Sequence, residues 1–296
     1  MYRERCKVLE NKKGAPGHYI LRLDSAKISK NARPGQFVQI LCANTTEPLL
    51  PRPFSFLSAS KRDFSVLYQV VGQGTKILSQ TSKGDLLWIL GPLGNGFDQG
   101  WGMGDGGRKK ICLLVGGGVG IPPLYYLAQQ LIKKIKRENI HVFLGAREKS
   151  ILLCEKDFKK LGVLLHLATD DGSRGYRGFV TTILDDFLSS SLIPHPSSHI
   201  YACGPTLMLK AVSLISQKYN VPCEVSVEVP MACGFGACLG CAIRVRSPES
   251  GVRSSKSQRN DSAASPNSQL LAPNYRFAIA CCEGPVFQAQ EIIWDP

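Results

Sequence analysis

The chain contains 296 residues, of which 44% are hydrophobic and 20% are charged. This composition is typical of a soluble globular protein with two or three modest domains. No run approaches the roughly 18 apolar residues of a transmembrane helix, and the first residues contain no apolar segment typical of a secretion signal. We therefore expect a cytoplasmic protein without a membrane partner.

The formal net charge is +13, which could indicate a nucleic-acid partner. The basic residues are dispersed, however, and the one denser run, residues 133–137, falls on a predicted helix. No helix-turn-helix, zinc-finger or aromatic–basic signature accompanies them. The charge is therefore interpreted as solvated surface, and no nucleic-acid partner is expected.

Short strands separated by turn residues are predicted in the first hundred residues. They cover residues 19–23, 37–41, 54–58, 64–71 and 86–90. This spacing predicts a small antiparallel β-barrel or sandwich. Gly, Asp and Met dominate residues 101–107, a composition that suits a flexible joint, so the first domain is expected to span residues 1–104.

Strands and helices alternate over the second expected domain, residues 105–222. The strands are predicted at 110–115, 141–145, 163–168 and 199–202, and the helices include 124–136 and 205–219. Alternation of this kind predicts an α/β domain around a parallel sheet.

The alternation stops at Cys223, and the third expected domain, residues 223–296, is small and rich in cysteine. Residues 247–274 within it are rich in Ser, Pro, Asn, Gln and charged side chains. Such a segment buries too little apolar surface to offset the entropy of ordering, so a disordered surface insert is predicted there. The whole chain is thus predicted to be multidomain, with a β-barrel, an α/β domain and a cysteine-rich domain.

Eleven cysteines are many for a cytoplasmic protein, and their odd number argues against a complete set of disulfides. The most specific motif is Cys233-x4-Cys238-x2-Cys241 followed by Cys281, the plant-type spacing of [2Fe–2S] ligands. The glycines between them suit a tight loop whose N–H groups can point at the cluster sulfurs. A zinc site and a set of buried free thiols are the alternatives, although zinc more often uses two Cys-x2-Cys pairs.

The sequence leaves the fourth ligand open because Cys281 and Cys282 are adjacent. In a strand their side chains would point in opposite directions, so only one of them could face a cluster. The insert before them does not prevent ligation, because lengthening a loop from about 15 to about 40 residues costs on the order of 1 kcal/mol.

A glycine-rich turn opens the expected α/β domain. The apolar run 111–115 continues into Gly-Gly-Gly-Val-Gly-Ile-Pro-Pro from Gly116 to Pro123, which predicts a strand, a turn and the start of a helix. Backbone N–H groups in such a turn can hold a pyrophosphate. The third glycine of the usual dinucleotide fingerprint is missing, so a simple tight turn is the alternative.

In the expected barrel, Arg52-Pro53-Phe54-Ser55 combines a guanidinium that can hold a phosphate with an aromatic ring and a hydroxyl. An exposed arginine before a core strand is the commoner explanation of so short a match. Two further glycine turns, 72–75 and 91–97, lie in the same domain and favour a ligand that approaches the backbone closely.

These motifs, together with Cys203-Gly204-Pro205 at the end of a late predicted strand, resemble those of the ferredoxin reductase superfamily. Within it, the chain most resembles the electron-transfer subunits of class 1B, NAD-dependent dihydroorotate dehydrogenases. The segments that carry this resemblance are Gly91-Pro-Leu-Gly-Asn-Gly-Phe97, Thr169-Asp-Asp-Gly-Ser173, Gly178-Phe-Val180, Met231-Ala-Cys-Gly-Phe-Gly-Ala-Cys-Leu-Gly-Cys241 and Cys281-x-Glu-Gly-Pro-Val-Phe287. The resemblance extends from about Tyr2 to Trp294 and fails only over the insert.

The resemblance implies three cofactors and the residues that bind them. FAD would be held by Arg52 at its pyrophosphate, by Pro53, Phe54 and Ser55 along its ring, and by Gly72, Gly74 and Thr75 at its phosphates. NAD would be held by Gly116, Gly117, Gly118 and Gly120, with Cys203, Gly204 and Pro205 beside the nicotinamide. A [2Fe–2S] cluster would be held by Cys233, Cys238, Cys241 and Cys281, since the Gly-Pro-Val-Phe that follows favours Cys281 over Cys282. The catalytic residues implied in this way are Ser55 and Cys203.

The resemblance also implies a function and a partner. The chain would pass electrons between NAD and a separate dihydroorotate dehydrogenase catalytic subunit that contains FMN, in pyrimidine biosynthesis, and the two subunits would form a heterotetramer. FAD suits this role because it exchanges a hydride with nicotinamide and single electrons with a cluster. Two alternatives stay open: a related NAD(P)H reductase subunit that serves ferredoxin, sulfite reduction or hydrogenase, and a zinc-stabilised nucleic-acid-binding protein.

Overall fold

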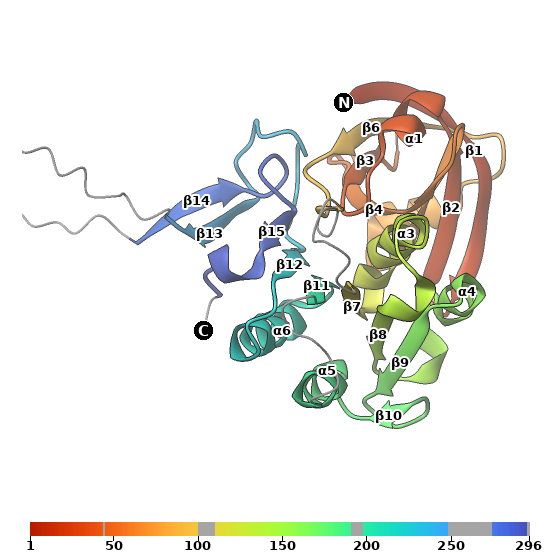
Figure 1. The fold of residues 1–296 in the computed structure, drawn as a ribbon. Coiled ribbons are helices and arrows are strands. Elements are labelled where there is room, and N and C mark those ends of the chain that lie inside the picture. Colours follow the sequence, from red (N-terminus) through yellow and green to blue (C-terminus); the bar gives the residue numbers. More distant parts are fainter. Residues whose placement is uncertain (44, 100–109, 191–197, 248–273, 295–296) are drawn as a thin grey trace, which may run out of the picture.

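The structure is a computed structural model that describes residues 1–43, 45–99, 110–190, 198–247 and 274–294. Figure 1 shows a β-barrel that includes the N-terminus, an α/β part beside it, and a smaller C-terminal part. The expected boundary at residue 104 and most of the insert, residues 248–273, lie outside the described residues. None of the helices in those described ranges combines the length and the apolar character that crossing a bilayer requires.

Six antiparallel strands close the barrel in the order β1-β2-β5-β4-β3-β6. Their bounds are β1 Tyr2–Ala15, β2 His18–Asp24, β3 Phe37–Leu41, β4 Arg52–Ala59, β5 Asp63–Gln69 and β6 Leu86–Leu93, with two short helices, α1 Ala26–Asn31 and α2 Gln73–Ser79, between them. The prediction of an antiparallel barrel is confirmed. β1 was not predicted, because only Cys6 and Val8 of this long, charged strand are buried.

A seven-stranded sheet forms the centre of the α/β part, in the order β10-β9-β8-β7-β11-β12-β15. The bounds are β7 Ile111–Gly117, β8 Ile140–Ala146, β9 Leu164–Thr169, β10 Tyr176–Arg177, β11 Ser198–Cys203, β12 Cys223–Ser226 and β15 Val286–Gln288. Neighbouring strands are parallel except β15, which runs antiparallel to β12. The predicted parallel sheet is confirmed, and the cysteine-rich segment leaves this sheet after β12 and returns to it at β15.

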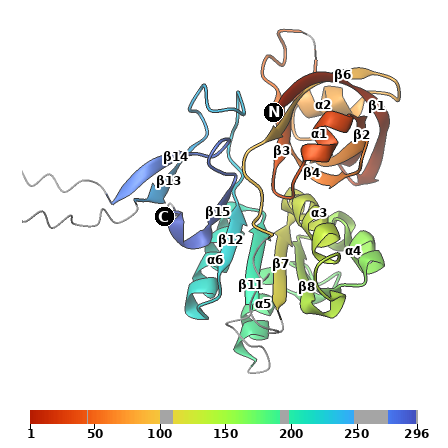
Figure 2. The same ribbon diagram turned by 45° about the horizontal axis from the view of Figure 1, so that its top comes forward.

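Helices cover both faces of the sheet (Figure 2). α3 Ile121–Leu131 and α4 Glu155–Leu161 pack on one face, and α5 Val180–Ser189 and α6 Thr206–Lys218 pack on the other. Short 3-10 turns lie at η1 Gly118–Gly120, η2 Arg137–Asn139, η3 Lys149–Ile151 and η5 Ala289–Glu291. Successive strand residues serve opposite faces, so Leu114 packs under α3 whereas Val115 packs under α5 and α6.

The barrel and the α/β part are packed against each other through α3. This helix lies against β4, and the buried Tyr126 donates a hydrogen bond from its hydroxyl to the carbonyl oxygen of Ala32 at 3.0 Å. α3 directly follows the glycine turn, and β4 begins with Arg52. The packing therefore brings the predicted flavin strand and the predicted dinucleotide turn to one side of the molecule.

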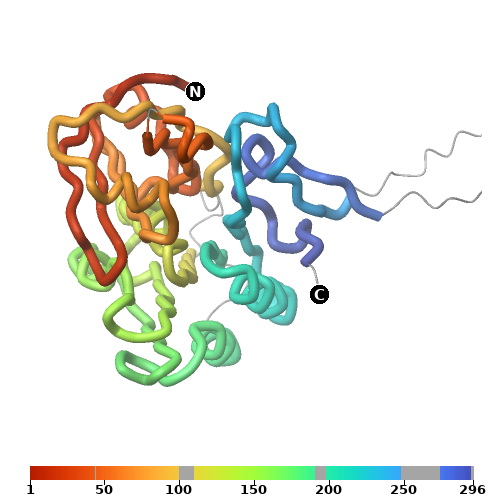
Figure 3. The backbone as a smooth tube through the Cα atoms, turned by 180° about the vertical axis from the view of Figure 1, so that it is seen from behind, coloured from red at the N-terminus to blue at the C-terminus, as the bar shows by residue number. Residues whose placement is uncertain are grey.

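The remaining strands, β13 Ala242–Arg246 and β14 Tyr275–Ile279, form an antiparallel hairpin that projects from the C-terminal part (Figures 1 and 3). Beyond β13, the N–H of Ser247 donates to the carbonyl oxygen of Asn274 at 3.2 Å. The insert therefore leaves and re-enters the described structure at a single point.

Candidate cofactor sites

The predicted flavin motif lies at the start of β4. Pairing with β3 places Arg52 opposite Ile40 and Ser55 opposite Phe37. Phe54 is buried in the barrel core, where its ring centroid lies 5.6 Å from that of Tyr68. Because side chains alternate along a strand, Pro53 and Ser55 point to the other side. Phe54 therefore shares no face with the two residues that the sequence analysis grouped with it.

Arg52 and Gly74 are neighbours at one end of the barrel. A Cβ atom placed on Gly74 would lie 3.4 Å from Nε of Arg52. Nη1 of Arg52 donates to the carbonyl oxygens of Leu50 at 2.6 Å and Pro51 at 3.3 Å, which orients the guanidinium. A fixed guanidinium beside a glycine backbone is a suitable anchor for a phosphate group.

Thr75 closes the turn before α2. Its Oγ1 accepts from the N–H of Val71 at 3.0 Å and of Gly72 at 3.1 Å, and it donates to the carbonyl oxygen of Gly72 at 3.0 Å. The hydroxyl therefore shapes the turn. The position next to Gly72 is open, since a Cβ atom there would meet no atom within 4 Å.

The predicted dinucleotide turn lies where β7 ends and α3 begins. Gly118 has a φ of +54°, a conformation that favours glycine. A Cβ atom on Gly120 would lie 2.4 Å from the carbonyl carbon and oxygen of Cys203 and 2.5 Å from the nitrogen of Gly204, and one on Gly117 would lie 3.1 Å from Cδ of Pro205. The two motifs predicted separately for NAD are thus in direct contact.

This contact lies at the carboxyl edge of the parallel sheet. β7 has β8 on one side and β11 on the other, so the chain direction around the sheet reverses at β7. Ligands of open α/β sheets bind at this kind of switch point. The geometry therefore supports a dinucleotide site formed by residues 116–120 and 203–205.

Cys203 is the last residue of β11 and is buried. Burial raises the pKa of its thiol to about 12, although a hydrogen bond with Ser226 opposes this shift. The thiol is therefore protonated at neutral pH, and it can contact a ring only as a neutral group, because the nucleophilic form of cysteine is the thiolate.

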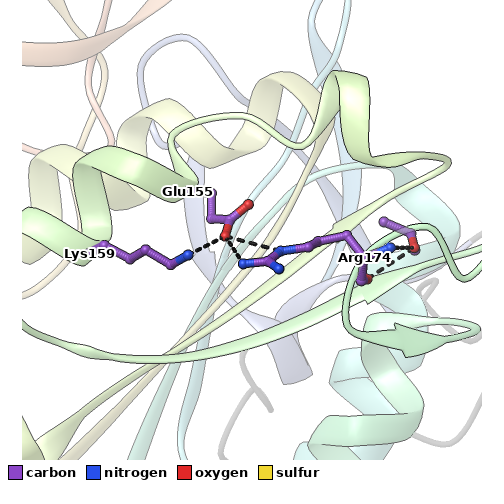
Figure 4. A network of polar contacts seen from close by, with 4 residues as sticks. Glu155, Lys159 and Arg174 are labelled. Atoms are coloured by element: carbon purple, nitrogen blue, oxygen red, sulfur yellow. Dashed lines mark hydrogen bonds and ion pairs between the residues drawn. The ribbon is translucent and has the colours of Figure 1, made fainter.

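A polar network holds the loop after β9 at the same edge of the sheet (Figure 4). Oε1 of Glu155 accepts from Nη2 of Arg174 at 2.6 Å and from Nζ of Lys159 at 2.6 Å. Burial alone would raise the pKa of Glu155, but the hydrogen bonds from Arg174 and Lys159 hold it below its ordinary value. The backbone N–H of Arg174 donates to Oγ1 of Thr169, and this hydroxyl donates to the carbonyl oxygen of Arg174. These hydrogen bonds fix the shape of the Thr-Asp-Asp-Gly-Ser segment 169–173.

The cysteine loop, residues 231–241, follows β12 and contains Cys233, Cys238 and Cys241. Gly234 and Gly236 have φ values of +82° and +87°, and such left-handed turns let the loop close tightly. Burial raises the pKa of the Cys233 thiol, but backbone N–H groups of residues 235, 237 and 238 and the thiol of Cys238 donate to it and lower the pKa to about 6. The lowered pKa favours the thiolate form of Cys233, which is the form that binds metal ions.

Cys241 and Cys281 form a second pair of thiols, and both are buried. The N–H of Cys281 donates to Sγ of Cys241 at 3.4 Å, and the N–H of Gly236 donates to Sγ of Cys281 at 3.1 Å. Burial and hydrogen bonds to the neighbouring thiols raise the pKa of the Cys281 thiol. The pair is thus held against the loop that carries Cys233 and Cys238.

The prediction that Cys281 and Cys282 point in opposite directions from a strand is wrong. β14 ends at Ile279, and a turn follows in which the N–H groups of Cys282 and Glu283 donate to the carbonyl oxygen of Ile279 at 2.9 and 2.8 Å. A turn does not alternate its side chains, and the two Sγ atoms are 3.8 Å apart. Both thiols therefore lie on the same side, with Cys281 buried and Cys282 exposed.

The thiols meet in pairs, and this arrangement fits a two-iron cluster. Within the described residues, no three Cys, His, Asp or Glu side chains form a group that could hold one metal ion. Structural zinc requires four donors around one ion, whereas a [2Fe–2S] cluster takes two thiolates at each of two irons. Hydrogen bonds connect Cys233 with Cys238 and Cys281 with Cys241, an arrangement compatible with two such pairs.

Gln39 joins the cysteine loop to the flavin strand, and the sequence analysis missed it. Its Nε2 donates to the carbonyl oxygen of Met231 at 3.2 Å, and a Cβ atom on Gly234 would lie 2.7 Å from its Cγ. Gln39 pairs with Pro53 across β3 and β4. One buried glutamine in an apolar strand carries no motif, so no sequence signal could have identified it.

Asn95, also missed, joins the barrel to the turn that carries Cys281. Its Nδ2 donates to the carbonyl oxygens of Cys282 at 3.2 Å and Glu283 at 2.9 Å. Its backbone N–H donates to the carbonyl oxygen of Gly284 at 2.5 Å. The glycine turn 91–97 and the segment 281–287 are therefore one structural unit. Both segments carry the resemblance described above, and their presence in one sequence was the only indication that they are in contact.

Comparisons with known proteins agree with this geometry. The model of the oxidoreductase NAD-binding domain matches residues 114–214, and that of the iron–sulfur cluster binding domain of dihydroorotate dehydrogenase B matches residues 228–256. The solved structure of an NADH-dependent reduced ferredoxin–NADP oxidoreductase, described for flavin-based electron bifurcation, is 28% identical with a TM-score of 0.75, covering 98% of this chain and 90% of that chain. A ferredoxin reductase of carbazole 1,9a-dioxygenase shares the fold at 21% identity, with a TM-score of 0.62 over 75% of this chain and 67% of that chain. The fold and the sites define an oxidoreductase of the ferredoxin reductase type.

Curated relatives narrow the class further. The chain is 36% identical to the electron transfer subunit of dihydroorotate dehydrogenase B (NAD(+)) from Caldanaerobacter subterraneus subsp. tengcongensis, over 99% of both chains. The corresponding subunits from Desulforamulus reducens and a Geobacillus species are 36% and 34% identical, over 98% and 99% of both chains. The chain belongs to this family, the electron-transfer subunits of dihydroorotate dehydrogenase B. The predicted oxidoreductase class and the predicted cofactors FAD, NAD and a [2Fe–2S] cluster are thereby confirmed, and the zinc alternative is set aside.

Proposed function

We propose that this chain carries electrons between NAD and the FMN-containing catalytic subunit of a dihydroorotate dehydrogenase, as one of the two kinds of subunit in a cytoplasmic heterotetramer. The observation that carries this proposal is the contact of the cysteine loop with Gln39, which pairs with Pro53 on the flavin strand. The predicted cluster and flavin sites are thus separated by a single strand, which suits electron transfer between them.

The residue assignments come from the resemblance, and the same geometry supports them. Bound FAD supplies the conversion between hydride transfer and single-electron transfer. Arg52 would bind its pyrophosphate beside the backbone of Gly74, while Pro53 and Ser55 would line the ring from the outer side of β4. Residues 116–120 would bind the NAD pyrophosphate through N–H groups, and the neutral thiol of Cys203 would lie beside the nicotinamide without reacting with it.

The cluster ligands would be the pairs Cys233 with Cys238 and Cys241 with Cys281. Cys238 is exposed, so one side of the site faces the surface of this chain. Beside it, the side chains of Phe235 and Leu239 are 49% and 60% exposed. Apolar side chains exposed around a redox centre favour a protein partner that covers them.

One pocket on this chain has an acidic lining. This pocket, of about 300 Å³, is lined by Asp98, Glu224, Glu283, Glu291 and Arg276, among others. Dihydroorotate is a carboxylate anion, and an excess of like charge disfavours its binding. This pocket is therefore not expected to bind dihydroorotate.

The test is a pull-down with the catalytic subunit from the same organism, followed by a dihydroorotate:NAD assay. Alone, the chain should oxidise NADH with an artificial acceptor and leave dihydroorotate unchanged, whereas the mixture should reduce NAD. Phe235→Asp should weaken the complex at least about tenfold, because it places a charge in an apolar contact. Leu207→Asp, on the exposed face of α6, is the matched control and should bind normally. Failure of the catalytic subunit to bind, with capture of a ferredoxin or a sulfite reductase subunit instead, would favour the general reductase alternative.

A further inference from the structure

Five thiols, one more than a [2Fe–2S] cluster binds, gather at the cysteine loop. Four belong to the spacing motif, and the fifth is Cys282. Its Sγ lies 3.8 Å from Sγ of Cys281. Two thiolates on one tetrahedral metal ion, with bonds of about 2.3 Å, lie roughly 3.8 Å apart. Cys281 and Cys282 therefore already have the separation of neighbouring ligands.

The backbone of Cys282 is held in place by the turn. Its N–H donates to the carbonyl oxygen of Ile279 at 2.9 Å, and its carbonyl oxygen accepts from Nδ2 of Asn95 at 3.2 Å. The next residue is anchored as well, because Oε1 of Glu283 accepts from the N–H of Ile279 at 2.8 Å and Oε2 accepts from Nη1 of Arg276 at 2.6 Å. Only the side-chain torsion of Cys282 has to change for its sulfur to move, and staggered rotamers differ little in energy.

The sulfur of Cys282 also borders the cysteine loop. A Cβ atom on Gly236 would lie 2.6 Å from this sulfur, and the N–H of the same glycine donates to Sγ of Cys281 at 3.1 Å. Both thiols therefore contact the part of the loop between Cys233 and Cys238. No second cysteine is adjacent in sequence to either of those two ligands.

We propose that Cys282 is a reserve ligand of the cluster, able to take the place of Cys281 beside Cys241. When Cys281 is absent or chemically blocked, the thiol of Cys282 gives its proton to water and binds the iron as a thiolate. One thiolate replaces another, so the exchange needs no oxidant or reductant. The inference rests on the cluster site proposed above, and it adds a residue that the spacing motif does not contain.

The test compares five forms of the full chain, purified without oxygen: wild type, Cys281→Ala, Cys282→Ala, the double variant, and Cys238→Ala. Alanine is used because a serine oxygen can itself bind iron. The readouts are iron and acid-labile sulfide per FAD and the EPR spectrum of the reduced protein. FAD content reports whether the barrel is folded, independently of the cluster.

Cys281→Ala should keep about half or more of its iron and sulfide with a changed EPR spectrum, and Cys282→Ala should match wild type. The double variant and Cys238→Ala should keep less than about a tenth. If Cys281→Ala is as empty as the double variant, or if the double variant keeps its cluster, the reserve role is overturned. Zinc without iron in wild type, or a full cluster in Cys238→Ala, would instead refute the proposed cluster site, so the two failures are distinguishable.

Discussion

Replacing Gly120 by alanine should disrupt the NAD site while leaving the flavin and cluster sites intact. The added methyl group would lie 2.4 Å from the carbonyl carbon and oxygen of Cys203 and 2.5 Å from the nitrogen of Gly204. Ordinary contacts begin near 3.4 Å, so the turn and the end of β11 must separate by about 1 Å, since backbone atoms cannot rotate away. Overpacking of this kind costs about 1–3 kcal/mol, and a shift of about 1 Å in a positioned substrate can lower its rate about 100-fold.

The assay is the reduction of the flavin by NADH, monitored as the loss of flavin absorbance in a stopped-flow instrument. The rate should fall at least about tenfold, with FAD and iron contents equal to those of wild type. Gly14→Ala is the control, because its new methyl group would lie 3.6 Å from the side chain of Ile20, an ordinary contact. A Gly120→Ala rate within about twofold of wild type, at unchanged NADH affinity, would refute the argument that this backbone contact shapes the NAD site.

Other changes test the remaining sites. Arg52→Ala should weaken FAD binding about tenfold or more, because a charge-assisted hydrogen bond contributes about 1.5–3 kcal/mol. The measurement is the flavin absorbance that remains after desalting, and the exposed Arg33→Ala is the control. Glu155→Gln should lower Tm by up to about 2–4 °C at pH 7, because it removes the ion pairs with Lys159 and Arg174, which together contribute up to about 1 kcal/mol. Because the pKa of Glu155 is lowered, this stabilisation is present above the ordinary pKa of 4.5 and is lost as the pH falls through the lowered pKa. The Tm difference between variant and wild type should therefore vanish in acid, and a difference that stays constant with pH would contradict the prediction. Replacing residues 248–273 by Asn-Gly should leave iron content, FAD content and NADH oxidation within about twofold of wild type. The nitrogen of Ser247 and the carbonyl oxygen of Asn274 are 3.2 Å apart, and a two-residue hairpin turn can join ends at this distance. Loss of iron would contradict this prediction.

Features set by local sequence were predicted well. Turn residues at regular spacing identified the barrel strands, because they mark where each short strand ends. Apolar runs alternating with helical segments identified the parallel sheet, because strands buried on both faces are apolar throughout. The glycine turn at 116–120 was predicted to end a strand and start a helix, and it does. The cysteine spacing predicted a cluster because the ligands within one tight loop are close in the chain as well as in space.

Features that depend on contacts between distant segments were not predicted. The hydrogen bond from Asn95 to Cys282 joins residues 187 positions apart, and no spacing rule encodes it. The direction of the Cys282 side chain depends on where β14 stops, and element boundaries are the least certain part of a sequence-based prediction. β1 was missed for a different reason, because half of its residues are charged and only Cys6 and Val8 alternate as buried residues, too short a pattern to detect.

The central sheet, as far as the described residues define it, ends in very short strands. β10 at one edge has two residues, and β15 at the other has three. A long free edge would offer unpaired N–H and C=O groups to another chain, and short edge strands are one way in which proteins avoid such pairing. Subunit association is therefore expected to use side-chain surfaces and not continuation of the sheet. A truncated chain that stopped after β12 would expose a fully buried strand edge, and aggregation of that fragment is the expected result.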